Sequence, residues 1–185
     1  GNGQKDANQT TDADRAAYMF GVRVGKSFNN VSFKPGITVW YDYLSGTNDE
    51  DQRDGSWNSF NTLFDTGHKF YGLQDVFLGV GSGGNTGTQG LGLQDLALKT
   101  KFNPMPGWTL KVDYHWFWTA ESIAANTTTS GVPNVVIAGG EAPSNNLGNE
   151  IDITAVTKMN ANTKVMIGYS HYDATQGFFA LKNTG

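Results

Sequence analysis

The sequence of 185 residues contains no cysteine, few charged side chains and no long apolar run. The absence of cysteine excludes disulfide scaffolds and thiolate metal sites. A transmembrane helix needs about 20 consecutive, mostly apolar residues, and no segment here comes near that length, so helical membrane spans are excluded. Charged residues make up only 16% of the chain, against about 25% in a typical soluble domain. The net charge of −4 disfavours a nucleic-acid-binding protein with a basic surface.

What the chain has in abundance is aromatic residues and glycine, with 11 Phe, 7 Tyr, 5 Trp and 24 Gly. Together with many β-branched residues, the aromatics argue against intrinsic disorder. The mean hydropathy is nevertheless only −0.41. A chain that is rich in aromatics and polar on average must separate the two kinds of residue, and the pattern along the sequence shows how.

Apolar and polar side chains alternate over six segments, which is typical of β-strands with one apolar face. In the clearest segment, Gly107 to Trp118, large apolar side chains occupy every second position from Trp108 onward. The length of the segments is close to the 9–11 residues that a tilted transmembrane barrel strand needs, by the usual rough rule. The six segments are residues 18–25, 37–44, 95–102, 107–118, 150–159 and 164–170.

The connections between these segments alternate between short and long. Residues 29–35, 103–107 and 160–162 are short turns, whereas residues 46–91 and 121–148 are long and rich in Gly, Asn, Thr and Ser. Transmembrane barrels combine short periplasmic turns with long extracellular loops. We therefore predict an all-β fold, an antiparallel transmembrane β-barrel with about six long strands in this sequence. Six strands are too few to close a barrel, because the smallest have about eight, so we expect a fragment of a larger one.

Three blocks of sequence resemble the alginate-export family of Gram-negative outer-membrane β-barrel porins. They are Phe60–Phe77 (FNTLFDTGHKFYGLQDVF), Gly92–Glu121 and Leu147–Phe179. The resemblance implies a barrel of about 18 strands, within the range known for such proteins, of which residues 1–185 would be the C-terminal portion of a single domain. It also implies location in the outer membrane and a role as a channel, with export of polysaccharide as the family's activity.

The polar positions of the alternating segments are the candidate pore-lining residues. Basic residues lie toward the short turns and acidic ones mostly toward the long loops. Rings of Lys and Arg favour anions in pores, although charges in a barrel lumen also pair across neighbouring strands, and both interpretations stay open. The candidates are Arg23, Lys99, Lys101, Lys111, Lys158, Lys164, Asp42, Asp95, Asp113, Glu150 and Asp152.

The apolar positions of the same segments are the candidate lipid-facing residues. Aromatic residues cluster toward the ends of this face, as in the girdles of membrane barrels. The expected surroundings are outer-membrane lipid and lipopolysaccharide, and the expected solute is polar or anionic; nucleic acid is not expected, and any periplasmic partner is unidentified. The candidates are Val39, Tyr41, Leu98, Leu110, Val112, Tyr114, Trp116, Ile153 and Ile167.

The sequence shows no pattern of catalytic or cofactor-binding residues. The three histidines, His68, His115 and His171, lack the spacing of a metal site, and neither a GxSxG elbow nor a cysteine nucleophile is present. We therefore predict no enzymatic activity, no metal and no cofactor.

Two alternatives to the channel remain open at this point. The first is a soluble extracellular β-sandwich, a carbohydrate-binding or fibre module that would bury the aromatic face between two sheets. The second is a structural barrel component of an outer-membrane complex. The mixed charges also leave the solute open, between a polyanionic polysaccharide and small anions or oligosaccharides.

Overall fold

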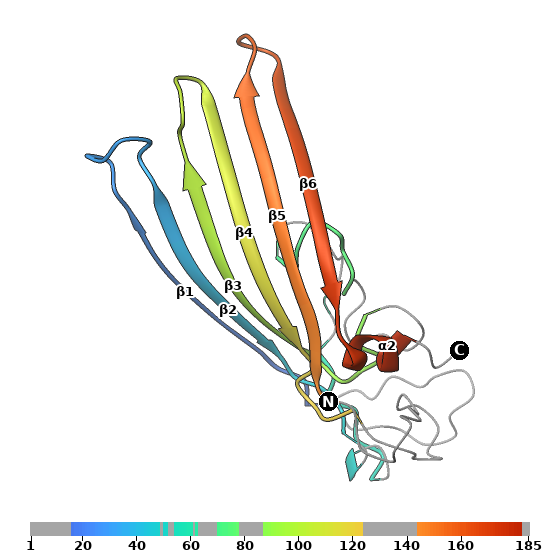
Figure 1. The fold of residues 1–185 in the computed structure, drawn as a ribbon. Helices are drawn as coiled ribbons and strands as arrows, with labels where there is room; N and C mark the ends of the chain where they lie inside the picture. Colours follow the sequence, from blue (N-terminus) through green and yellow to red (C-terminus); the bar gives the residue numbers. More distant parts are fainter. Residues whose placement is uncertain are drawn as a thin grey trace.

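The computed structural model describes residues 16–48, 50–51, 54–60, 62, 70–77, 87–123 and 144–182. This part of the chain forms six long strands and one short helix (Figure 1). The prediction of an all-β fold with six antiparallel strands is confirmed. The elements are β1 (Met19–Ser27), β2 (Gly36–Leu44), β3 (Leu93–Phe102), β4 (Trp108–Trp118), β5 (Asn146–Lys158), β6 (Lys164–Ala174) and α2 (Gln176–Lys182).

The six strands form one sheet in which each strand pairs with its neighbour in the sequence. All five pairings are antiparallel, and the register is continuous apart from one irregularity between Phe117 and Trp118. The sheet is not closed, since β1 and β6 are its edges among the described residues. This arrangement is consistent with part of a barrel wall, because up-and-down barrels are built from strands paired in chain order.

The two ends of the sheet differ, as Figure 1 shows. The three short connections lie together at one end, which we call the turn end. The described residues that adjoin the strands in the long connections lie with α2 at the other end, which we call the loop end. The structure alters one predicted boundary there: β5 begins at Asn146, so the long connection predicted to reach residue 148 is shorter. Asn146 joins the ladder because it pairs with Trp118 across the irregularity.

Successive side chains of a strand point to opposite faces, so the register fixes two faces of the sheet. The apolar face carries side chains such as Val39, Leu98 and Tyr114, which are direct neighbours across β2, β3 and β4. Among the described residues nothing covers this face: Val39 is 48% exposed and Ile167 63% exposed. The opposite face, which we call the polar face, carries the charged side chains.

The buried core lies at the loop end. Its members include Leu44, Leu93 and Phe117 from the strands, Phe77 from the β2–β3 connection, and Leu181 from α2. Leu44 and Phe117 lie in predicted strands, whereas Phe77 lies in a predicted loop, and α2, which packs on β5 and β6, was not predicted. None of the helices in the described residues is long and apolar enough to cross a membrane.

Candidate functional site: the polar face of the sheet

The structure places all eleven candidate pore-lining residues on the polar face and all nine candidate lipid-facing residues on the apolar face. The register pairs show the division directly. Asp113 lies opposite Lys99 on one side and Asp152 on the other, whereas Val112 lies opposite Thr100 and Ile153. It stays a prediction that the polar face meets solute and that the apolar face meets lipid.

Asp42 and Arg23 form an ion pair between β1 and β2. The Arg23 Nη2 atom lies 2.6 Å from Asp42 Oδ1 and 2.8 Å from Oδ2, and the Trp40 indole donates to Oδ2 at 2.8 Å. The guanidinium also lies 3.8 Å from the centroid of the Trp40 ring, a cation–π geometry. Gly21 makes room for the pair, because a Cβ there would lie 2.2 Å from the Arg23 guanidinium. The fully buried Asp42 carboxylate is therefore matched by a cation.

A second charged cluster joins β3 and β4 in the half of the sheet nearer the loop end. His115 and Asp95 are fully buried, and His115 Nδ1 lies 2.9 and 3.0 Å from the two Asp95 carboxylate oxygens. The other ring nitrogen, Nε2, lies 3.1 Å from Lys99 Nζ. Lys99 also lies 3.4 Å from Asp113 and 5.1 Å from the centroid of the Trp40 ring. Arg23 and Lys99, expected in a basic ring, are thus engaged with acidic and aromatic partners instead.

Residues 70–77 of the β2–β3 connection fold back over the polar face and contact β5. The Gln74 amide donates to Glu150 Oε1 at 3.0 Å, and the Leu73 amide donates to Asp152 Oδ2 at 3.2 Å. Ser170 of β6 also donates to Glu150 Oε1, at 3.0 Å. Glycine is required at position 72, where φ is +85° and a Cβ would lie 2.4 Å from Glu150 Oε1. Glu150 and Asp152 therefore hold a loop on the face that the sequence predicted to be open lumen.

Aromatic packing around Phe77 holds the C-terminal end of residues 70–77 in place. The fully buried Phe77 ring lies 4.7 Å from that of Phe117 and 6.0 Å from that of Tyr172, measured between centroids. Phe178 of α2 packs against Phe77 as well, at 6.3 Å. Sequence reasoning treated the connection as polar and missed this role. The available signal was Phe70, Tyr71 and Phe77, large apolar side chains in a stretch otherwise read as loop.

The turn end of the polar face has a different character, with four exposed lysines. Lys101 lies directly opposite Lys111, and Lys158 directly opposite Lys164. No described residue forms an ion pair with any of the four. Lys101 and Lys111 border a hollow of about 310 Å³ whose lining also includes Gly25 and Gly36. Two pairs of like charges thus lie at the turn end of the polar face.

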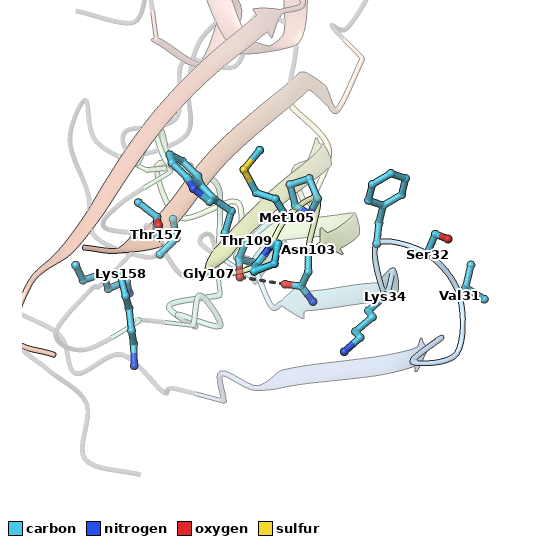
Figure 2. A pocket seen from close by; sticks show the side chains of 15 residues that line it. Val31, Ser32, Lys34, Asn103, Met105, Gly107, Thr109, Thr157 and Lys158 are labelled. Carbon is cyan, nitrogen blue, oxygen red and sulfur yellow. Dashed lines mark hydrogen bonds between the residues drawn. The ribbon is translucent and has the colours of Figure 1, made fainter. Parts of the chain in front are cut away.

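A larger hollow, of about 850 Å³, lies among the short turns (Figure 2). The Asn103 amide donates to the Phe33 carbonyl at 2.7 Å and so ties the first two turns together. Phe33 and Lys34 both have positive φ, +64° and +43°, an uncommon conformation for residues other than glycine. Figure 2 shows Lys34, Met105 and Lys158 around the hollow, so its lining is apolar and basic.

The histidines and carboxylates form no metal site in the described part of the chain, where no three His, Asp or Glu side chains are grouped to hold an ion. His171 lies on the apolar face, opposite Ile151. His68 lies outside the described residues. The site is therefore a charged face of the sheet that residues 70–77 of the β2–β3 connection cross.

Comparison with known proteins identifies the family of this chain. A family model with the description "Alginate export" matches residues 1–179. A search of curated proteins gave no match. The chain therefore belongs to the alginate export family, an outer-membrane transport family of Gram-negative bacteria.

Proposed function

We propose that this sheet is part of the wall of an outer-membrane channel that passes anionic solutes, and that the solute is an anionic polysaccharide. The observation that carries the proposal is the group of four lysines at the turn end of the polar face. Like charges directly opposite each other on a sheet are destabilising. Pairing across strands therefore does not account for Lys101 with Lys111 or Lys158 with Lys164, whereas an anion in the path would be attracted by both pairs.

The apolar face supports the membrane part of the proposal. Its aliphatic side chains are exposed in the middle of the sheet, where Leu98 and Ile153 are 38% and 37% exposed. Tryptophans lie on the same face at both ends of β4, with Trp108 at the turn end and Trp116 at the loop end. Apolar bands flanked by aromatic girdles are typical of transmembrane barrels. A β-sandwich would bury this face under a second sheet, and the described residues form one layer.

Measurement of ion selectivity in planar bilayers tests the proposal. We expect the intact protein to prefer anions in a salt gradient, and the double substitution Lys101→Gln with Lys111→Gln to reduce that preference. Lys26→Gln is the matched control, because Lys26 pairs with Ile37 on the apolar face, one position from Gly36, which pairs with Lys101 on the polar face. Cation preference in the wild-type protein would contradict the proposal, as would an equal effect of the control substitution.

The solute class needs a separate measurement, because small anions would respond to the same lysines. Short oligosaccharides that carry carboxylates should interrupt the ionic current, and neutral oligosaccharides of equal length should do so much less. Equal block by both would remove the anionic polysaccharide from the proposal and leave a general channel. The lysine substitutions should weaken the block by the acidic oligosaccharide in parallel with the change in selectivity.

A further inference from the structure

His115 occupies a position in the wall where its two ring nitrogens have partners of opposite charge. Nδ1 faces the Asp95 carboxylate at 2.9 Å, and Nε2 faces the Lys99 ammonium at 3.1 Å. A carboxylate only accepts hydrogen bonds, so Nδ1 carries the hydrogen and donates it. An ammonium only donates, so Nε2 must be the accepting nitrogen. These partners therefore assign a neutral imidazole with its proton on Nδ1.

This assignment makes two events mutually exclusive. A second proton on the imidazole can only go to Nε2, and it would take the lone pair that Lys99 uses. The imidazolium and the ammonium would then be two cations at the 3.1 Å distance that now separates an acceptor from a donor. Lys99 would have to leave the contact. Histidine is the one side chain whose ordinary pKa lies between about pH 5 and 8, so acidification is the condition under which to test this exchange.

We propose that His115 is a positioning residue that holds the Lys99 ammonium against the wall when it is neutral and releases Lys99 into the solute path when it is protonated. Acidification then adds charge to the path in two ways, through the new imidazolium and through a freed ammonium. The consequence is that anion preference rises as the pH falls. This consequence for solute rests on the proposed channel function, whereas the tautomer and the Lys99 contact do not.

The other charged groups around His115 come from several elements. Asp42 of β2 and Asp95 of β3 lie on the same face, and Asp113 precedes it by two positions on β4. Glu150 of β5 is its direct neighbour in the register, with Asp152 one step further along the same face. Arg23 of β1 and Tyr172 of β6 lie on the same face, and Asp75 belongs to residues 70–77, which contact Glu150 through the Gln74 amide.

Those carboxylates also titrate in acid, so the test must isolate His115 from them. His115→Gln keeps an amide that can donate to Asp95 and an oxygen that can accept from Lys99, but it does not titrate. His171→Gln is the matched control, because His171 lies on β6 on the apolar face and its exposed ring has no such partners among the described residues. All surrounding carboxylates remain in both variants, so differences between them report on the histidine that was changed.

The first readout is the side-chain nitrogen spectrum of ¹⁵N-labelled histidine in the intact protein in detergent micelles, with signals assigned from the two variants. We expect His115 to show the neutral form with hydrogen on Nδ1 at neutral pH and to become imidazolium in mild acid. Hydrogen on Nε2 at neutral pH, or no change down to about pH 5, would overturn the proposal. This readout does not depend on channel activity.

The second readout is the anion-to-cation permeability ratio from reversal potentials across the same pH range. We expect the ratio of the wild-type protein and of His171→Gln to rise on acidification, and His115→Gln to lose most of that rise. Equal pH dependence in all three proteins would overturn the role of His115 in selectivity. A protein that gives the expected spectrum but no conductance would instead contradict the proposed channel function.

Discussion

The charged side chains at the two ends of the polar face differ in their burial and in their partners. At the loop end Asp42, Asp95 and Glu150 are fully buried, and each has a hydrogen-bonding partner: Arg23, His115 and the Gln74 amide respectively. At the turn end the lysines are exposed and lie opposite one another without described ion-pair partners. Burying a charge is costly unless it is paired and hydrogen-bonded. The difference indicates that the loop-end charges stabilise the sheet, and it supports our proposal that the turn-end charges meet the solute.

The loop end should be the more sensitive to mutation, and Phe77→Ala should have the largest effect. Phe77 is fully buried between Phe117, Tyr172 and Phe178, and removal of a buried phenylalanine ring costs about 3–5 kcal/mol. We expect the free energy of unfolding in micelles, followed by tryptophan fluorescence against denaturant, to fall by this order.

Phe179→Ala is the control for that measurement, since Phe179 is a neighbour in α2 but is 53% exposed. It should change the stability by much less. Similar losses in the two variants would mean that the core at the loop end is not what holds residues 70–77 in place, and the contrast between the ends would disappear.

The anchor of residues 70–77 on Glu150 is the next test. Glu150→Ala removes the acceptor of the Gln74 amide and of the Ser170 hydroxyl, and an unsatisfied buried donor costs about 1–3 kcal/mol. We expect faster hydrogen exchange at the Gln74 amide and easier proteolysis within the β2–β3 connection. Glu150→Gln keeps an accepting oxygen and should show a smaller change. Unchanged exchange in Glu150→Ala would show that the aromatic packing alone fixes the loop.

The lysines at the turn end should behave in the opposite manner. Lys158→Gln removes one of two directly opposed like charges, so stability should stay within about 0.5 kcal/mol of wild type, as for other surface substitutions. The same substitution should lower the anion preference measured in bilayers. A clear loss of stability would show that Lys158 has a structural role, and the two ends would then differ less than their burial indicates.

The sequence was sufficient to predict the strands and the two faces, because alternation has a strict period of two and a sheet preserves it. Trp108 to Trp118 is the clearest example, since its six apolar positions all lie on one face of β4. The contacts of the polar face could not be predicted in the same way. Nothing local to Gly72 or Phe77 indicates that they meet Glu150 and Phe117, which lie far along the chain. Long-range folding of a connection depends on tertiary packing and leaves no periodic signal.

The prediction of charged residues shows the same limit. Spacing placed Arg23 and Lys99 correctly on the polar face but grouped them with the turn-end lysines. Which cation meets which anion depends on the strand register and on the stagger between strands. Lys99 reaches both Asp113 and His115 only because β3 and β4 pair at one particular register, and a shift of one residue would place its side chain on the other face.

The smallest expected effect concerns Glu121, which follows β4 at the loop end. Burial, with the nearby Asp51 carboxylate, raises the pKa of Glu121 above its ordinary value, although a hydrogen bond from Asn48 acts in the other direction. The folded state disfavours the ionised carboxylate. The free energy of unfolding therefore falls as the pH rises from the ordinary glutamate pKa through the raised pKa of Glu121. Glu121→Gln should therefore be slightly more stable than wild type at neutral pH and should lose this part of the pH dependence.

The control is Glu50→Gln, at an exposed position in the same region, which should change neither the stability nor its pH dependence. Denaturation at several pH values would check this, and a variant that is destabilised at neutral pH would place Glu121 among the matched charges of the loop end instead.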